Sequence, residues 1–415
     1  MSKAKPFSIA KREVWGAYKR VKVNRGAAGI DRQTVEEFEK DLSNNLYKLW
    51  NRMSSGSYFP APVRRVEIPK PDGRKRPLGI PTVTDRVAQM VVKQYLEPIL
   101  EPHFHRDSYG YRPGKSALQA VGEARKRCWE YHWVLDLDIR SFFDTIDHKL
   151  LMRAVRKHTD CKWVLLYVER WLEAPVQMPD GTLEDRRKGI PQGGVISPLL
   201  ANLFLHYALD KWMERHFPEI PFERYADDVI CHCKGEKQAK YLLDTIRCRL
   251  AECRLELNMQ KTKIVFCKDS YRNGSYANES FDFLGFTFRS RLSKSRNGRY
   301  FVNFSPAVSN TATKTIRQEI RSWNLHRRTD KSLEDFARMF NPIIRGWINY
   351  YGSYYKSALY QTLWHLDRII SRWAGRKYKR LRGRQRKAQR WLRRIRNRQS
   401  WLFAHWRFAY TWAGR

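Results

Sequence analysis

Two aspartates stand side by side at positions 227 and 228, directly before the apolar residues Val229 and Ile230. Adjacent carboxylates repel each other and are costly to bury, so their place before a core-like strand requires a neutralising partner. A third carboxylate, Asp138, ends another apolar run. Mg²⁺ prefers such oxygen ligands, and a pair of ions can activate an attacking hydroxyl and stabilise a leaving pyrophosphate. The Asp-Asp dipeptide alone would fit an ordinary polar turn, but together with Asp138 it favours a metal-dependent catalytic site.

Hydrophobic spacing predicts the elements that position these carboxylates. Residues 134–139 alternate as a strand, with Asp136 and Asp138 on one face, and residues 222–233 form a hairpin around the aspartate pair. Asp147 is expected to cap the next helix. The other expected elements are a helix over 34–50, a hairpin over 63–81, a helix over 83–100, a loop over 188–203 leading into a helix, a helix near 237–255, short strands over 256–266 and 281–288, and mainly helices beyond residue 290.

Charge indicates a polyanionic partner. The chain of 415 residues carries 80 lysines and arginines against 42 aspartates and glutamates, a net charge of +38. No acidic residue follows Asp367, and more than half of residues 376–398 are basic. Without interleaved counter-charges this segment is not a simple solvated face, so nucleic acid is the first expectation and an anionic membrane surface the second.

Cysteine usage and the N-terminus indicate a reducing, cytoplasmic setting. The 7 cysteines form no C-x-x-C pair, which argues against a disulfide framework and against a zinc ribbon. Cys231 and Cys233 are expected as small buried side chains of a strand rather than metal ligands. No run is long enough to span a membrane, and the N-terminus has no apolar signal segment, although its basic character leaves an organellar transit peptide as a weaker alternative.

Tyr225-Ala226-Asp227-Asp228 resembles the YxDD box of reverse transcriptases. Further boxes similar to that family follow in the same order along the chain, at residues 70–78, 107–113, 136–144, 189–203, 257–263 and 283–286. The loop over 24–31 and the segment 341–351 resemble the reverse transcriptase/maturase proteins encoded in group II introns. The resemblance covers roughly residues 15 to 360, and its ordered set of boxes is far more specific than any single one.

The resemblance implies roles for the residues of these boxes. Asp138, Asp227 and Asp228 would hold two Mg²⁺ ions, for which Mn²⁺ can substitute, and Asp136 would be a supporting group. The implied deoxynucleotide-binding residues are Lys70 and Arg76, with Arg74 or Lys75 as substitutes, together with Gln192 and the sugar-discriminating Phe143. Lys261 would be the proton donor, with Lys263 as a rival, and Phe283, Leu284 and Gly285 would grip the primer.

The C-terminal third resembles a region that grips intron RNA. Arg345, Gly346 and Trp347 are the matching residues. Arg380, Arg384 and Arg394 of the basic tail are expected to contact RNA or DNA. The aromatic residues of the tail could stack bases or simply pack, and the sequence leaves both open: Trp391, Trp401, Phe403, Trp406 and Phe408.

The expected fold is α+β, a right-hand polymerase with fingers, a palm with a small antiparallel sheet, and a helical thumb or maturase domain with a basic C-terminal extension. The expected boundaries are 1–60 for a helical N-terminal extension, 61–290 for fingers and palm, 291–375 for the thumb and 376–415 for the extension. No Cys follows Cys267, so we expect no C-terminal nuclease module with Cys and His ligands.

The expected function is RNA-directed DNA polymerisation combined with binding of an intron RNA to assist splicing and retrohoming. The expected partners are group II intron RNA in a ribonucleoprotein, an RNA template with a DNA primer, target DNA and dNTPs, with no membrane, in a bacterial, nucleoid-associated location. The alternatives are an RNA-binding splicing factor with an incidental polymerase and a domesticated, defence-type reverse transcriptase. An RNA-synthesising polymerase is disfavoured by Phe143 at the position that contacts the sugar.

Overall fold

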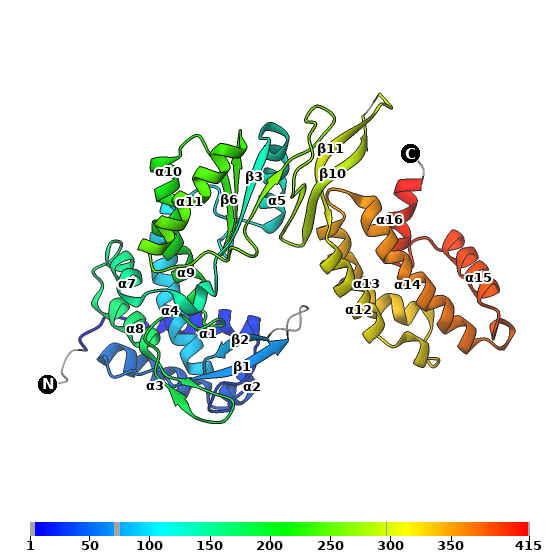
Figure 1. The fold of residues 1–415 in the computed structure, drawn as a ribbon. Helices are drawn as coiled ribbons and strands as arrows, with labels where there is room; N and C mark the ends of the chain where they lie inside the picture. The colour runs from blue at the N-terminus through cyan, green and yellow to red at the C-terminus, as the bar shows by residue number, and fades with distance from the viewer. Residues whose placement is uncertain (1–4, 70–74, 296, 414–415) are drawn as a thin grey trace. The chain divides into compact units, whose positions relative to one another are not determined.

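The computed structural model describes residues 5–69, 75–295 and 297–413 (Figure 1). The chain divides into two compact units. The first comprises Met1–Ala120 and Leu135–Ile264, and the second comprises Val121–Val134 and Val265–Arg415. These two units are not the four segments expected from the sequence. The boundaries of those segments stay a prediction.

The N-terminal part of the first unit combines helices with a small mixed sheet. Its elements are α1 (Lys11–Asn24), α2 (Val35–Glu39), α3 (Leu42–Ser55), β1 (Val63–Pro69), β2 (Lys75–Ile80) and α4 (Val83–Leu100). β1 and β2 pair antiparallel, as predicted for the 63–81 hairpin, and β1 continues the sheet by pairing with β4 (Val176–Gln177), which pairs with β5 (Leu183–Glu184). Thr82 caps α4, because its hydroxyl accepts a hydrogen bond from the Asp85 amide at 3.0 Å.

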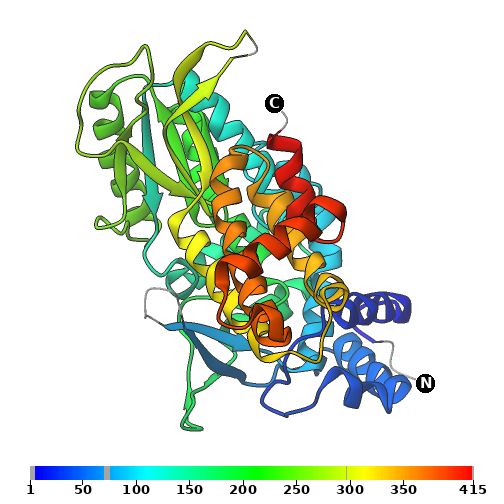
Figure 2. The same ribbon diagram turned by 90° about the vertical axis from the view of Figure 1, so that its right-hand side faces the viewer.

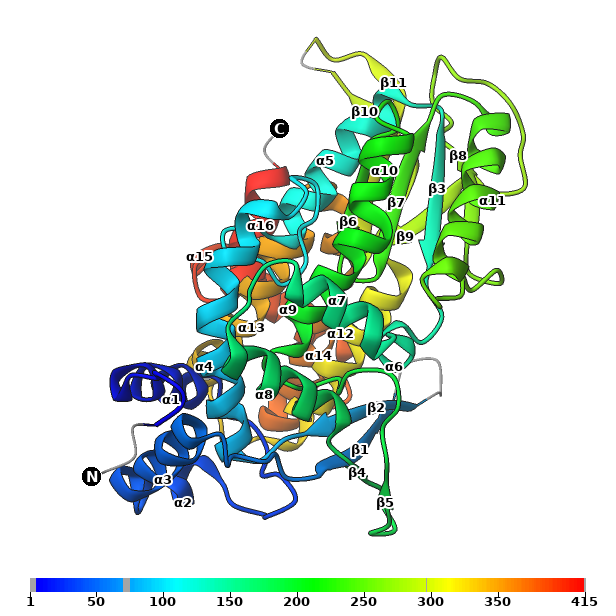
Figure 3. The same ribbon diagram turned by 90° about the vertical axis from the view of Figure 1, so that its left-hand side faces the viewer.

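The second sheet carries the predicted carboxylates and has the strand order β6-β7-β3-β8 (Figure 3). These strands are β3 (Trp133–Asp138), β6 (Phe222–Tyr225), β7 (Asp228–Cys233) and β8 (Lys263–Phe266). The helices of the same region are α6 (Phe142–Thr145), α7 (His148–Arg156), α8 (Lys162–Glu173), α9 (Ser197–Leu205), α10 (Lys211–His216) and α11 (Glu236–Glu252). One wide π-type turn, His206–Asp210, joins α9 to α10. Asp147 caps α7 as predicted, accepting from the Leu150 amide at 2.9 Å.

The second unit contains α5 (Ala117–Glu130) from Val121 onward and a three-stranded antiparallel sheet. The strands are β9 (Ser280–Phe283), β10 (Phe286–Lys294) and β11 (Tyr300–Val308), in the order β11-β10-β9. β10 and β11 form a long twisted hairpin, which Figure 2 shows as a yellow-green ribbon. Trp129 of α5 donates to the Phe304 carbonyl of β11 at 2.9 Å, which ties the helix to this sheet.

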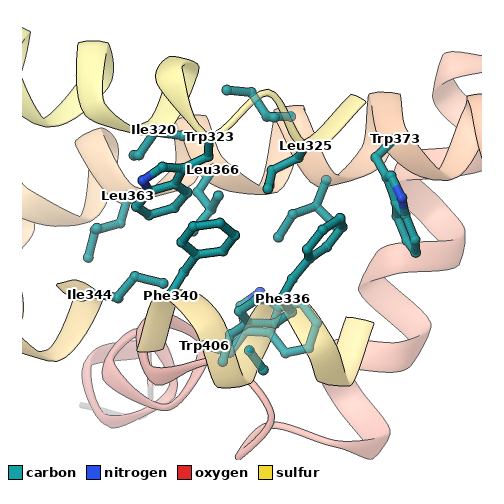
Figure 4. Packing of buried hydrophobic residues seen from close by; sticks show 14 of the residues in the cluster. Ile320, Trp323, Leu325, Phe336, Phe340, Ile344, Leu363, Leu366, Trp373 and Trp406 are labelled. Atoms are coloured by element: carbon teal, nitrogen blue, oxygen red, sulfur yellow. The ribbon is translucent and has the colours of Figure 1, made fainter. Parts of the chain in front are cut away.

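The helices of the second unit enclose a large aromatic core (Figure 4). They are α12 (Asn310–Ser322), α13 (Leu333–Tyr351), α14 (Lys356–Lys377), α15 (Gln385–Arg398) and α16 (Ala404–Ala413). Trp323 stacks on Phe340 with ring centroids 4.0 Å apart, and Phe336 meets Trp373 edge to face. Trp406 is 1% exposed in the same core, so the basic tail is folded onto α13 and α14 by apolar packing.

Four local expectations require correction. The single helix over 34–50 is two helices, α2 and α3, separated at Asp41, whose φ of −129° and ψ of 48° are not helical. The strand expected over 256–266 begins only at Lys263. The segment 281–288 is not one strand but the end of β9, a turn at Leu284-Gly285 and the start of β10. Strands persist to Val308, well beyond residue 290.

None of the helices in the described part of the chain combines the length and apolar character that a membrane crossing requires.

Candidate active site

The predicted carboxylates open onto one cavity of about 960 Å³ in the first unit. Asp138 reaches it from the end of β3, and Asp227 and Asp228 from the turn between β6 and β7. The remaining predicted residues that line the same cavity come from β2, from the helix after β3, from the loop before α9 and from the loop before β8: Arg76, Phe143, Gln192 and Lys261. Residues from separate stretches of the chain thus line one cavity.

The turn that carries Asp227 is tight. β6 and β7 pair antiparallel with Tyr225 opposite Asp228, so that Ala226 and Asp227 form a two-residue connection. Ala226 has a φ of 56°, an uncommon conformation for a residue with a side chain. Gly110 packs against this connection, and a Cβ atom at that position would lie 2.4 Å from the Ala226 nitrogen. Only glycine therefore permits this approach.

A buried network beneath the turn fixes its backbone. The Arg224 guanidinium, which is 0% exposed, binds both carboxylate oxygens of Asp210 at 2.7 and 2.5 Å. Its remaining nitrogen donates to the Asn202 side-chain oxygen at 2.9 Å and to the Ala226 carbonyl at 3.1 Å. Asn202 donates in turn to the Gly110 carbonyl at 2.6 Å. The network therefore holds both Ala226, the residue just before Asp227, and Gly110, which packs against Ala226.

Sequence reasoning did not single out Asn202, Asp210 and Arg224. A signal was present for Asn202, which interrupts the apolar run of α9, but not for Arg224, which stands beside Glu223 in the four-residue strand Phe222–Tyr225. Because buried charges are almost always paired, an arginine in a core strand requires an acidic partner elsewhere in the chain. The sequence does not say which of the many acidic residues supplies it.

Burial and mutual repulsion raise the pKa values of two carboxylates in the cavity. Burial, and after it the neighbouring charges of Asp227 and Asp138, raise the pKa of Asp228 to about 6. Burial and the charge of Asp138 also raise the pKa of Asp227, while Arg76 and Lys261 lower it. The Asp228 side chain is accessible from the cavity, but the surrounding protein replaces most of the bulk water that would otherwise stabilise its charge.

Lys261 compensates part of this negative charge. Its ammonium lies 3.0 and 3.1 Å from the two Asp138 carboxylate oxygens. The rival Lys263 begins β8 and is not among the residues that line the cavity, and neither is Asp136. Lys75 lines the cavity but pairs with Glu67 at 2.8 Å, and the predicted Lys70 and its substitute Arg74 lie outside the described residues.

The donor chemistry of the cavity suits Mg²⁺. Carboxylate oxygens are the ligands that Mg²⁺ accepts, and the raised pKa values of Asp227 and Asp228 mark negative charge that a divalent cation would relieve. In the part of the chain that the structure describes, no group of three or more acidic, His or Cys side chains is drawn together tightly enough to form a ready ligand set. Asp138 is instead held by Lys261.

The predicted primer-grip residues lie in the second unit, at the turn between β9 and β10. Leu284 and Gly285 have φ angles of 50° and 79° there. Tyr350 of α13 donates from its hydroxyl to the Leu284 carbonyl at 2.8 Å, and the Ser309 amide donates to the Gly285 carbonyl at 3.0 Å. Phe283 is buried beside this turn. Tyr350 of α13 thus supports the turn through its hydroxyl group.

The predicted RNA-binding residues are spread over the helices of the second unit. Arg345 and Gly346 are exposed on α13, whereas Trp347 stacks on Trp323 with ring centroids 5.7 Å apart. Three exposed arginines of the tail follow: Arg380, Arg384 and Arg394. Among the tail aromatics, Phe403 and Trp406 are buried, Trp391 and Phe408 pack at the edge of the core, and Trp401 is exposed.

Comparison with known protein families identifies the region that contains the carboxylate cavity. A family model described as reverse transcriptase (RNA-dependent DNA polymerase) matches residues 68–288, more than half of the chain. The chain belongs to the reverse transcriptase family. Residues 313–392 match the model of the group II intron, maturase-specific domain. The resemblance read from the ordered boxes is confirmed, as are the α+β class with a polymerase sheet and the assignment to RNA-directed DNA polymerases, a family that generally uses Mg²⁺.

Several curated proteins are similar to this reverse transcriptase. Protein YkfC of Escherichia coli K12 is 33% identical over 301 residues, which cover 62% of this chain and 74% of that protein. The group II intron-encoded protein LtrA of Lactococcus lactis subsp. cremoris is 35% identical over 253 residues, covering 55% of this chain but only 40% of LtrA. Among solved structures, a Candida albicans telomerase in complex with a telomeric RNA fragment aligns over 91% of this chain and 68% of that chain, with a TM-score of 0.46 and 12% identity.

Proposed function

We propose that this reverse transcriptase copies an RNA template from a DNA primer and also binds a folded group II intron RNA, so that the intron splices, reverse-splices and moves to new DNA targets. The observation that carries the polymerase part is the cavity shared by Asp138, Asp227 and Asp228 with Arg76, Phe143 and Gln192. The maturase-specific match at residues 313–392 supports the second part.

The acidic residues of the cavity would hold the metal ions. Asp138, Asp227 and Asp228 would bind two Mg²⁺ ions, or Mn²⁺ in their place, which when bound supply activation of the primer hydroxyl and stabilisation of the leaving pyrophosphate. The network of Arg224 and Asp210 keeps the backbone of the turn in place, so that Asp227 needs no rearrangement when charge develops.

The other residues of the cavity would bind and select the nucleotide. Arg76 supplies positive charge for the triphosphate, since negative charge builds up on the departing pyrophosphate. The Phe143 ring would collide with a ribose 2′-hydroxyl and so favour dNTPs. Gln192, followed by Gly193, which has a φ of 124°, lies on a loop whose backbone can approach the sugar and base. Lys261, held 3.0 Å from Asp138, would donate the proton that the pyrophosphate requires.

The basic helices of the second unit would bind the intron RNA. α15 carries basic residues over most of its surface while burying only Ala388 and Leu392, so its charge is directed outward. A positive surface of this kind binds RNA through phosphate contacts, with an affinity that falls as salt rises. Target DNA and the template–primer duplex would use the same class of contact.

The decisive experiment is primer extension on an RNA template with Mg²⁺, comparing the native chain with Asp227→Ala and with Asp160→Ala, an exposed aspartate of the same unit. We expect DNA synthesis by the native chain and the Asp160 variant and none by the Asp227 variant. Structured-RNA binding retained by Asp227→Ala would separate the maturase role from polymerisation. Tight RNA binding without any extension by the native chain would instead favour a splicing factor whose polymerase is not used.

A further inference from the structure

A hollow of about 560 Å³ lies between α14 and α15, within the second unit and outside the polymerase cavity. Its walls include Trp364 and Arg368 from α14 and Arg390 and Arg393 from α15. α15 is anchored beneath the hollow by the buried side chains Ala388 and Leu392, so the walls rest on a packed core. The volume falls in the range of small-molecule binding sites.

Trp364 is much more exposed than the tryptophans that pack inside the helical core beside it. It is 51% exposed, whereas Trp373 and Trp406 of the same helical core are 0% and 1% exposed. Its ring lies roughly parallel to Tyr360, with centroids 6.3 Å apart and an angle of 19°. Within the described residues no lysine or arginine covers the Trp364 ring by a cation–π contact, so part of the aromatic surface is free to stack. A single exposed aromatic residue is common, and its surroundings are what distinguish this one.

The surroundings of Trp364 are positively charged and lack an available counter-charge. Arg368, Arg390 and Arg393 are exposed, and within the described residues none of them pairs with a carboxylate. The acidic residue of the hollow is Asp367, whose Oδ1 already accepts from His405 at 2.9 Å and Trp406 at 2.8 Å and whose Oδ2 accepts from Arg396 at 3.5 Å. Repulsion among these arginines is relieved when an anion enters.

We propose that this hollow binds one unpaired nucleotide of RNA, with the base stacked on Trp364 and the flanking phosphates held by Arg368, Arg390 and Arg393. The combination of an open aromatic face and unpaired guanidinium groups is the chemistry that recognises single-stranded rather than paired RNA. In a duplex, every base is already stacked and its face is hidden. The inference rests on the proposed binding of intron RNA and adds where an unstacked base of that RNA would be held.

The test compares Trp364→Ala with Trp364→Phe and with Trp401→Ala, an exposed tryptophan of the same region at 69% exposure that does not line the hollow. Binding is measured by fluorescence anisotropy with a short single-stranded RNA and with the same RNA annealed to its complement. We expect Trp364→Ala to weaken single-strand binding about 5- to 150-fold, Trp364→Phe to retain most of it, and Trp401→Ala to match the native chain. Duplex binding should change by less than about twofold.

The arginines provide an independent readout. Arg390→Ala and Arg393→Ala should each lower the slope of log affinity against log salt by about 0.7 for single-stranded RNA. Equal binding by the Trp364 and Trp401 alanine variants, or an equal loss with duplex RNA, would overturn the proposal. If these variants bound RNA as the native chain does but lost binding to vesicles containing phosphatidylserine, the hollow would be assigned to a membrane surface instead. A native chain that binds no RNA at all would refute the proposed function itself, a result distinct from any of these.

Discussion

Replacing Asp210 by Asn tests whether the buried network beneath the turn that carries Asp227 contributes as much stability as its geometry indicates. Asp210 and Arg224 are both 0% exposed, so the substitution leaves a guanidinium charge without its counter-charge in the interior. Breaking such a pair from one side costs about 3–5 kcal/mol. That is a large part of the roughly 5–15 kcal/mol by which folded domains are stable. Urea unfolding followed by circular dichroism should therefore show a clear fall in midpoint for Asp210→Asn.

The matched control is Glu214→Gln, which removes the same charge one turn further along the chain. Glu214 pairs with Lys211 at 2.7 Å, but both side chains are about half exposed, at 51% and 52%. Exposed pairs contribute at most about 1 kcal/mol, so this variant should unfold close to the native midpoint. An Asp210→Asn variant as stable as Glu214→Gln would refute the reasoning about the buried pair.

A double variant separates stability from positioning. Asp210→Leu combined with Arg224→Met removes both charges, and replacing a buried ion pair by apolar side chains is often neutral or stabilising. The Ala226 carbonyl nevertheless loses its donor from Arg224, so the turn is no longer fixed beside Asp227. A displacement of about 1 Å at a reacting centre can lower the rate about 10²-fold. We expect a stable protein with primer extension reduced to that extent, and a double variant that extends primers at the native rate would show that Arg224 does not position the turn.

Three further substitutions test separate parts of the structure. Gly110→Ala places a methyl group 2.4 Å from the Ala226 nitrogen, so primer extension should fall by about 10²-fold in a folded protein. Phe143→Val should admit ribonucleotides, measured as rNTP incorporation relative to dNTP incorporation on one template. Burial opposes the charged form of Asp367, but the charge and hydrogen bond of His405, together with the Trp406 hydrogen bond and the Arg396 charge, outweigh burial and hold the pKa of that carboxyl below its ordinary value. The stability that Asp367 adds should therefore be present near pH 5 and be lost as the pH falls below about 4, measured as the difference in unfolding free energy between the native chain and Asp367→Asn.

Each of these substitutions has a control or a contradicting result. Gly235→Ala adds a methyl group with no atom within 4 Å and should leave extension intact, which separates a local clash from a general loss of glycine. Unchanged discrimination against rNTPs in Phe143→Val would remove Phe143 from the sugar-selecting role. A pH-independent difference between native and Asp367→Asn proteins down to about pH 3 would show that the carboxyl is not stabilised in its charged form.

The local parts of the fold were predictable because their signals are local. The hairpin of β1 and β2 follows from a turn sequence between alternating residues, and Asp147 caps its helix through a contact only three residues away. The turn at Leu284-Gly285 was missed although the alternation changes phase there, from Phe281 and Phe283 before the turn to Phe286 and Phe288 after it. What stabilises that turn is the Tyr350 hydroxyl, from 66 residues further along the chain, and a single sequence does not show such a contact.

The same distinction explains the split of the 34–50 segment. Its apolar residues follow helical spacing throughout, since α2 and α3 both bury one face: Val35 and Phe38 in the first helix, Leu46 and Leu49 in the second. Periodicity reports which residues are buried, but not whether the backbone between them stays helical. The carboxylates proposed for catalysis could be singled out because they lie in compact sequence motifs.

The position of the positive charges around the carboxylates explains why this arrangement suits a polymerase. Arg224, the basic residue nearest in sequence to the aspartate pair, is fully paired with Asp210 and so holds the turn without neutralising it. Arg76 and Lys261 face the carboxylates across the cavity and lower the pKa of Asp227, but burial still outweighs them. The chain therefore fixes the shape of the turn with one compensated ion pair and leaves the carboxylates themselves under-compensated. A site in that state attracts divalent cations, and through them a triphosphate that bare carboxylates would repel.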